Sequence, residues 1–265
     1  MSWTVFTTAP VAVAICFNAA VWDAIATVLY SRAYTLNGVS SAIMSAAFQC
    51  LALNGVQPHL LAVSNGAGVF IALIIANKGT GSPLSPAQKT AAGLMVAGGV
   101  TGLAGISPPD STAKLSSDKL VTFVLAAYAL SAACAAIPSV TWVRDGSNIL
   151  RQLSRKWLFP AADAINASAF TACLMLASVA AEPWALGFLP IAGSLTLASS
   201  VASLRINTVA DHVCICYIGW CVGLLILDLI GGYRFNAVLV VVQMACFAIA
   251  LLLILKDPQK EASSR

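Results

Sequence analysis

Charged side chains are scarce in this sequence, and their scarcity excludes most soluble folds. Only 9% of the 265 residues are Asp, Glu, Lys or Arg, whereas 59% are hydrophobic. A soluble domain carries about 25% charged residues. The composition therefore predicts an all-α integral membrane protein. The formal net charge of +4 is better explained by membrane topology than by a nucleic-acid partner, which we do not expect.

Motifs for catalysis and cofactor binding are also missing. The sequence contains no His-Glu-x-x-His zinc motif, no Gly-x-Ser-x-Gly elbow and no Walker phosphate loop. Its eight cysteines form no Cys-x-x-Cys pair, and all lie in apolar segments, which is typical of small buried hydrophobic side chains. We therefore expect no enzymatic activity, no cofactor and no metal site.

What the chain has instead is a series of apolar runs, each long enough to cross a bilayer. The N-terminal segment 1–10 has no Lys or Arg to start a cleavable secretory signal, so the first run is expected to remain as a span. Nine transmembrane helices are predicted, at about 8–30, 36–55, 58–77, 88–107, 119–142, 158–181, 184–204, 207–230 and 235–255.

The distribution of basic residues agrees with nine spans. Counted over alternate connections, 11 of the 14 Lys and Arg residues lie on one side and 3 on the other. Cytoplasmic connections carry the excess of Lys and Arg. This asymmetry predicts a C-terminus on the cytoplasm-equivalent side and an N-terminus opposite, without indicating which membrane.

The only two histidines, His59 and His212, belong to an internal repeat. They are 153 residues apart, and the same offset gives 7 identities over the 29 positions 41–69, including a shared Asn-x-Val-x-x-His spacing. With nine spans, the two histidines face opposite compartments, so the repeats are inverted and pack 4+5 helices. The predicted organisation is a first repeat at 1–107, a connection at 108–118, a second repeat at 119–255 and a polar tail at 256–265.

Two blocks of the chain resemble the drug/metabolite transporter superfamily, whose EamA-like members are inverted-repeat membrane carriers. The first block, 52–106, contains Leu84-Ser85-Pro86-Ala87-Gln88 and Gly98-Gly99-Val100, and the second, 204–255, contains Gly231-Gly232-Tyr233-Arg234-Phe235. Only Arg234 matches the charged turn of that family. The family's glutamate and its first helix are both missing. The resemblance implies a carrier fold with helices at the ends of the repeats that can support dimers.

Polar residues inside the first predicted span are candidates for substrate binding. A charge near the bilayer midplane costs about 3 kcal/mol, so such a group usually faces an interior cavity. Asp23 lies in this span, with Asn18 and Trp22 nearby on the helix. The alternative is that Asp23 pairs with Arg32 at the helix end.

A second polar pair lies in the sixth predicted span, which corresponds to the first in the repeat. Asp163 is followed three residues later by Asn166, so both lie on one helix face. We expect this pair to meet the Asp23 cluster across the internal pseudo-twofold axis. The alternative is that Asp163 is a helix-start charge favoured by the helix dipole.

His59 and His212 begin predicted helices, where an imidazole can bind an anion or titrate as a gate. The alternative is a position at the headgroup boundary. Asp211 is either a first-turn helix charge or the partner of His212. Three further side chains are candidates for lining a cavity or for packing: Asn65, Tyr217 and Trp220.

The leading interpretation is a secondary transporter of a small polar metabolite that works by alternating access, with ion coupling through Asp23 or Asp163. The main alternative is a noncatalytic structural subunit of a larger membrane complex that retains a carrier-like fold. A third and weaker interpretation is a divalent-cation channel or carrier. The predicted spans contain few carboxylates, which argues against a path for such cations. The expected partners are membrane lipid, a small-molecule substrate, and either a second copy of the chain or a larger membrane complex.

Overall fold

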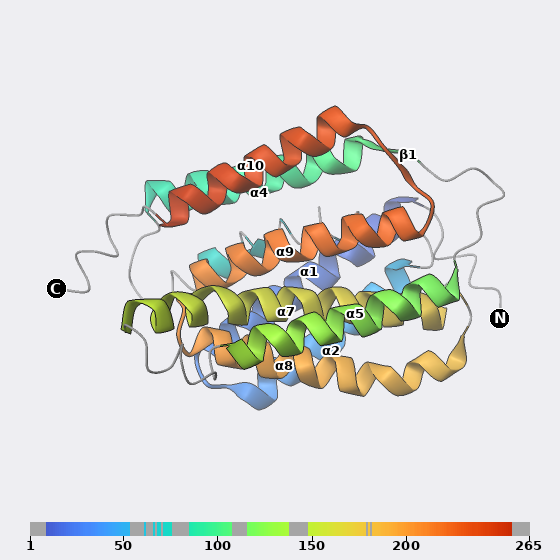
Figure 1. Cartoon of the computed structure of the whole chain (residues 1–265), viewed down its shortest axis with the longest axis horizontal. Helices are drawn as coiled ribbons and strands as arrows, with labels where there is room; N and C mark the ends of the chain where they lie inside the picture. Colours follow the sequence, from blue (N-terminus) through green and yellow to red (C-terminus); the bar gives the residue numbers. More distant parts are fainter. Residues whose placement is uncertain are drawn as a thin grey trace.

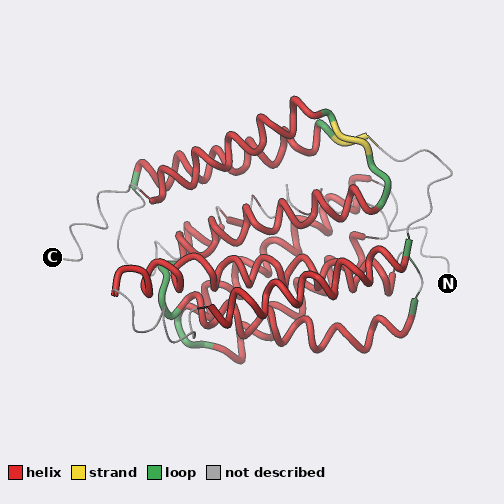
Figure 2. Tube along the Cα trace, in the orientation of Figure 1, coloured by secondary structure: helices red, strands yellow, loops and turns green. Residues whose placement is uncertain are grey.

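The computed structural model describes residues 9–53, 61, 66, 68–69, 71–75, 85–107, 116–137, 148–178, 180 and 182–255, and they are almost entirely helical (Figures 1 and 2). The elements are α1 (Ala9–Ser31), α2 (Thr35–Leu53), α4 (Pro86–Ala104), β1 (Ile106–Ser107), α5 (Ser117–Ala136), α7 (Asn148–Ser178), the 3-10 helix η3 (Pro183–Phe188), α8 (Leu189–Leu204), α9 (Val209–Ile230), β2 (Arg234–Phe235) and α10 (Ala237–Leu255).

Six of the described helical segments are long and apolar enough to cross a membrane, and α10 is a shorter apolar helix. These helices confirm the prediction of a multi-pass helical membrane protein. The predicted third span, 58–77, lies mostly outside the described residues; its described positions, including 71–75, are helical. Helix α4 is not among these six segments, and its first turn carries the polar residues Gln88 and Lys89.

Polar residues immediately before three helices satisfy their free N-terminal amides. Before α4, the Ser85 hydroxyl accepts a hydrogen bond from the Gln88 amide, and the Gln88 side chain accepts one from the Ser85 amide. This reciprocal pair is a capping box, with Pro86 at the first helical position. Thr208 caps α9 through the Asp211 amide, and Asn236 caps α10 through the amide of the second residue of that helix.

Helices α4 and α10 pack against each other and form a layer at one side of the bundle (Figure 1). Their packing is close because Gly98 faces Phe247 and Gly102 faces Gln243. At one end, β1 pairs with β2 in an antiparallel bridge, and the Asn236 amide donates to the Gly105 carbonyl at 2.8 Å. Because β1 follows α4 and β2 precedes α10, the two helices run antiparallel.

The turn between α9 and β2 depends on a glycine. Gly232 has φ 81°, in the left-handed region that residues with a Cβ rarely adopt. The turn is closed by the Tyr233 amide, which donates to the Asp228 carbonyl at 3.0 Å. The two strands were not predicted, since residues 106–107 were assigned to the end of a span.

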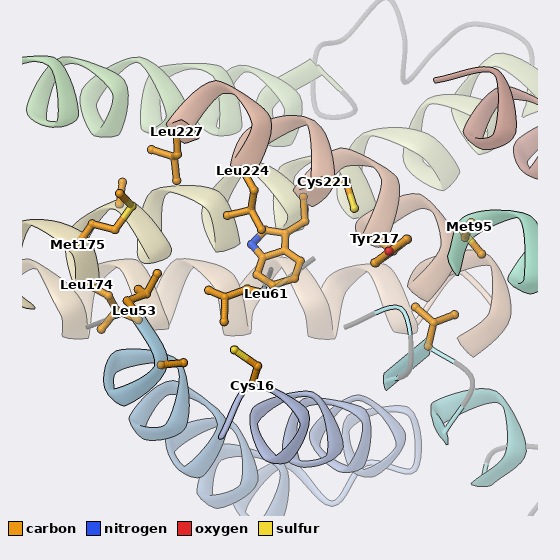
Figure 3. Close-up of a cluster of buried hydrophobic side chains, with 14 of the residues drawn as sticks. Cys16, Leu53, Leu61, Met95, Leu174, Met175, Tyr217, Cys221, Leu224 and Leu227 are labelled. Atoms are coloured by element: carbon orange, nitrogen blue, oxygen red, sulfur yellow. The ribbon is translucent and has the colours of Figure 1, made fainter. Parts of the chain in front are cut away.

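Helix α7 is central, with α5, α8 and α9 packed around it. It begins at Asn148, ten residues before the predicted start at 158, so the connection expected between the spans 119–142 and 158–181 is helical where it is described. Glycines allow α9 to approach α7: a Cβ at Gly219 would lie 2.7 Å from the Ala164 Cβ, and one at Gly223 would overlap Ser168. Leu224, Leu227, Leu174 and Met175 belong to the main hydrophobic core (Figure 3).

Candidate functional site

A cavity of about 440 Å³ lies among helices from both halves of the chain. This volume is in the range of small-molecule sites, about 300–1,000 Å³. The wall is mostly apolar, but several polar side chains contribute to it: Asp23 of α1, Ser45 and Gln49 of α2, Asp163 of α7, Ser200 of α8, and His212 and Cys216 of α9. Among the described lining residues there are two carboxylates and no Lys or Arg.

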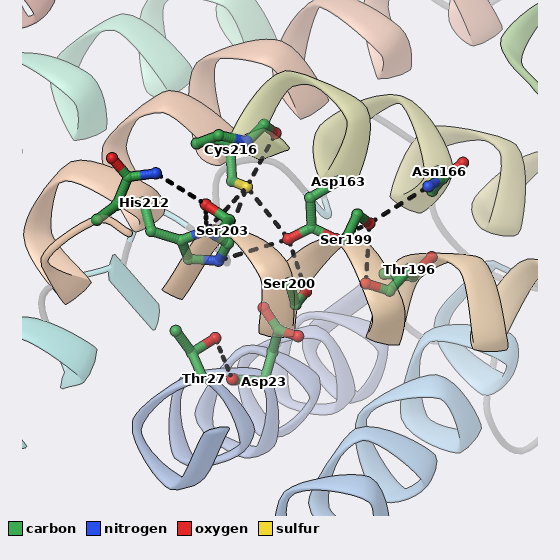
Figure 4. A network of polar contacts seen from close by, with 12 residues as sticks. Asp23, Thr27, Asp163, Asn166, Thr196, Ser199, Ser200, Ser203, His212 and Cys216 are labelled. Carbon is green, nitrogen blue, oxygen red and sulfur yellow. Dashed lines mark hydrogen bonds and ion pairs between the residues drawn. The ribbon is translucent and has the colours of Figure 1, made fainter. Parts of the chain in front are cut away.

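Asp163 is the centre of the polar network shown in Figure 4. Its Oδ2 accepts a hydrogen bond from the Ser200 hydroxyl at 2.6 Å, and its Oδ1 accepts one from the Ser199 hydroxyl at 3.1 Å. The Nε2 atom of His212 lies 3.4 Å from Oδ2. Asp163 is buried, so these contacts offset part of the cost of removing a carboxylate from water.

Both carboxylates lie well inside apolar helices. Asp163 is fifteen residues after the start of α7 at Asn148, so the alternative of a helix-start charge favoured by the dipole is wrong. At 1.5 Å per residue, Asp163 lies about 10 Å along the helix axis from Lys156, the basic residue that precedes it on α7. Asp23 lies about 12 Å from the end of α1 by the same rise.

Asp23 faces the network from α1, on the other side of Ser200 (Figure 4). Its expected alternative partner, Arg32, donates instead to the Ile75 carbonyl, at 3.4 Å. The Thr27 hydroxyl donates to the backbone carbonyl of Asp23 and leaves the carboxylate free to face the cavity. The structure thus brings the carboxylates of Asp23 and Asp163 into one cavity.

His212 is held by a chain of hydrogen bonds that begins at a proline. Pro160 lies inside α7 and has no N–H, so the Lys156 carbonyl loses its helical donor. The Asn207 amide group donates to that carbonyl at 3.2 Å and to the Ser203 hydroxyl at 3.1 Å. Ser203 Oγ in turn lies 2.8 Å from His212 Nδ1. The second copy of the Asn-x-Val-x-x-His spacing therefore places Asn207 and His212 on either side of Ser203.

Asp211 immediately precedes His212 on α9. It lies in the first turn of α9, and its carboxylate is 3.9 Å from the Lys156 ammonium. It is therefore a first-turn helix charge, the first of its two predicted roles.

Cys216 departs from its expected role as an inert hydrophobic side chain. Its Sγ lies 3.3 Å from Asp163 Oδ2, 3.2 Å from the Pro160 carbonyl and 3.8 Å from His212 Nε2. His212 and Cys216 are four residues apart on α9, so both project from one helix face. Asp163, His212 and Cys216 together form the group that could hold a metal ion among the described residues.

The remaining predicted residues differ in their position relative to the cavity. Tyr217 and Trp220 line the cavity and are buried, and the Tyr217 ring also packs edge-to-face on Phe247, with centroids 6.0 Å apart. Asn166 lies behind the wall, where its Nδ2 donates to Ser199 Oγ. The exposed Asn18 bonds its own helix at the Ala14 carbonyl, so the prediction that it binds substrate is wrong.

Trp22 is half-buried one residue before Asp23 and is not part of the cavity wall, so its predicted role is also wrong. His59 and Asn65 lie outside the described residues. His212 is buried at the cavity, as the fourth residue of α9.

The serines of α8 and the thiol of Cys216 were not predicted from the sequence to belong to the site. Ser199, Ser200 and Ser203 lie within five residues of one span, which is a polar signal in an otherwise apolar segment. Cys216 gave no such signal, because its role depends on the position of Asp163, 53 residues earlier.

Comparison with known proteins gives no family model, no curated protein and no solved structure that matches this chain. The resemblance to the drug/metabolite transporter superfamily therefore remains a prediction from the sequence.

Proposed function

We propose that this protein is a secondary transporter of a small polar metabolite that works by alternating access between two inverted repeats. The observation that carries the proposal is the cavity, because residues of both proposed repeats line it and two intramembrane carboxylates face it. Binding sites near the interface of two repeats are the usual arrangement in secondary transporters.

Helix packing supports the inverted repeat. In the proposed 4+5 arrangement, α1, α2 and α4 correspond to α7, α8 and α10. Helix α1 packs on α2 as α7 packs on α8, and α4 and α10 pack against each other in antiparallel directions. Glycines bring the third predicted span close to α1, and its counterpart α9 close to α7: Gly68 faces the Ala20 carbonyl, and Gly219 faces Ala164. Helix α5 is then the additional helix of the second repeat.

The charge of the cavity narrows the substrate class. Asp23 and Asp163 face it, and the described wall offers no Lys or Arg as a counter-charge to an anion. A neutral or cationic polar solute therefore fits the wall better than an anion.

Transport by the purified full chain in liposomes tests the proposal. Saturable uptake of at least one solute from a panel of cationic, neutral and anionic metabolites is expected. Asp23→Asn should lower that uptake at least tenfold without changing insertion, and a pH gradient should alter the rate if the carboxylates couple protons. Asp118→Asn is a matched control, because Asp118 is exposed in the first turn of α5.

Absence of saturable flux across the panel, together with copurification of stoichiometric partners, would support the structural-subunit alternative instead. An Asp118→Asn effect as large as that of Asp23→Asn would contradict the proposed role of the cavity.

A further inference from the structure

We propose that Asp163, His212 and Cys216 bind a divalent transition-metal ion of the Zn²⁺ class, with one coordination position open to the cavity. The site follows from the donor atoms alone. It stands independently of the transport proposal, since an ion can bind there whether or not the protein carries a solute.

The donor atoms have the spacing of a tetrahedral site. Asp163 Oδ2 lies 3.4 Å from His212 Nε2 and 3.3 Å from Cys216 Sγ, and that sulfur lies 3.8 Å from Nε2. Zinc bond lengths of about 2.0 Å to oxygen and nitrogen and about 2.3 Å to sulfur separate tetrahedral ligand atoms by about 3.3–3.6 Å. The spacing of the donor atoms therefore suits an ion, and the imidazole must rotate to direct Nε2 at it, because the sulfur is equidistant from both ring nitrogens.

Other side chains already orient two of the three ligands, Asp163 and His212. Ser199 and Ser200 hold the two oxygens of Asp163, and Ser203 Oγ lies 2.8 Å from His212 Nδ1. With the proton on Nδ1 and donated to Ser203, Nε2 presents its lone pair to the ion. Partners of this kind fix the tautomer and orientation of metal ligands, and their loss typically costs 10–100-fold in affinity.

The donor set selects the class of ion. A thiolate, an imidazole and a carboxylate suit Zn²⁺ or Co²⁺, whereas Mg²⁺ and Ca²⁺ prefer oxygen ligands alone. On binding, the S–H bond of Cys216 breaks, the sulfur–metal bond forms and the proton leaves to solvent. The thiolate and the Asp163 carboxylate then balance the two positive charges, which lowers the cost of burying the ion.

Three protein ligands leave a fourth position unfilled by the chain. Sites with three protein ligands keep that position for water or an exogenous molecule. Asp163, His212 and Cys216 all contribute to the cavity wall, so this position faces the same space as Asp23. A solute with a free oxygen or nitrogen donor could complete the coordination.

The test uses the full-length protein in detergent, stripped with a chelator and titrated with Co²⁺. We expect one equivalent to bind, with a thiolate-to-cobalt charge-transfer band and the intense visible d–d bands of tetrahedral Co²⁺. Zn²⁺ should displace it, and Mg²⁺ should not. X-ray absorption at the zinc edge should show one sulfur among nitrogen and oxygen ligands.

Substitutions locate the site. Cys216→Ala should abolish the charge-transfer band and weaken Zn²⁺ binding at least tenfold, and Ser203→Ala should weaken binding about tenfold with the band retained. Cys246→Ala is the control, because this half-buried thiol lies on α10. If Cys216→Ala fails to fold, His212→Gln replaces it and should weaken Zn²⁺ binding to the same extent.

Three results would overturn the site: wild-type protein that binds Co²⁺ without the charge-transfer band, a band that survives Cys216→Ala, or a band that disappears in Cys246→Ala. Transport that fails while these signals persist would reject the carrier proposal and leave the metal site standing.

Discussion

Replacing Asn207 by Ala probes how the chain tolerates a proline inside a membrane helix. The Asn207 amide donates to the Lys156 carbonyl that Pro160 leaves without a helical donor, and also to Ser203. A buried carbonyl without a donor costs about 1–3 kcal/mol. We expect Asn207→Ala to lower the free energy of unfolding by about that amount.

The cost of Asn207→Ala should depend on the residue at position 160. In a Pro160→Ala background, the amide of residue 160 can bond the Lys156 carbonyl, so Asn207→Ala should lose only the Ser203 bond, about 0.5–1.5 kcal/mol. The two substitutions should therefore couple by about 1 kcal/mol in a double-mutant cycle. Unfolding of the four proteins in mixed micelles, followed by circular dichroism, measures this coupling.

Asn18→Ala serves as the control, because Asn18 is exposed and bonds only its own helix; its expected effect is below about 0.5 kcal/mol. A coupling energy of zero between positions 160 and 207 would refute the compensation. So would an Asn207→Ala cost no larger than that of Asn18→Ala.

Two further predictions concern packing and topology. Gly219→Ala should destabilise the protein by about 1–3 kcal/mol, because its Cβ would lie 2.7 Å from the Ala164 Cβ and force α9 away from α7. Gly93→Ala, which meets open space, should be neutral or stabilise by up to about 1 kcal/mol in the same unfolding measurement. Equal losses would show that α7 and α9 do not approach as described. Arg205→Cys and Arg234→Cys, exposed at opposite ends of α9, should react with a membrane-impermeant maleimide from opposite sides of sealed vesicles. Labelling of both from one side would contradict a membrane-spanning α9.

The helical membrane class could be predicted from composition, because an apolar run about 20 residues long has few other stable arrangements. The residues at which helices begin were harder to predict than the fold class. The segment 148–156 carries Arg151, Arg155 and Lys156 and was expected to lie in the connection between two spans. In the structure, α7 continues through it. Charge density gave the wrong boundary because a helix can extend past the hydrocarbon into water.

The candidate site was only partly predictable. Asp23 and Asp163 stood out because charge is rare and costly within apolar spans. The prediction for Asn18 was wrong because a residue close to Asp23 on the same helix does not necessarily face the cavity. Cys216 could not be found, since its importance lies in contacts between helices α7 and α9, and the specific role of Ser203 depends on its contact with His212 across α8 and α9.

The bridge between β1 and β2 constrains how the two halves can separate. It fastens the end of α4 to the start of α10 beyond the C-terminal end of α9, whereas His212 lies eighteen residues before that end, about 27 Å along the helix axis. Helices α4 and α10 also pack on each other beyond the bridge, with Gly98 against Phe247 and Gly102 against Gln243. If the two halves separate as the proposed transport cycle requires, the separation would be smallest at the bridged end of the bundle and larger near His212.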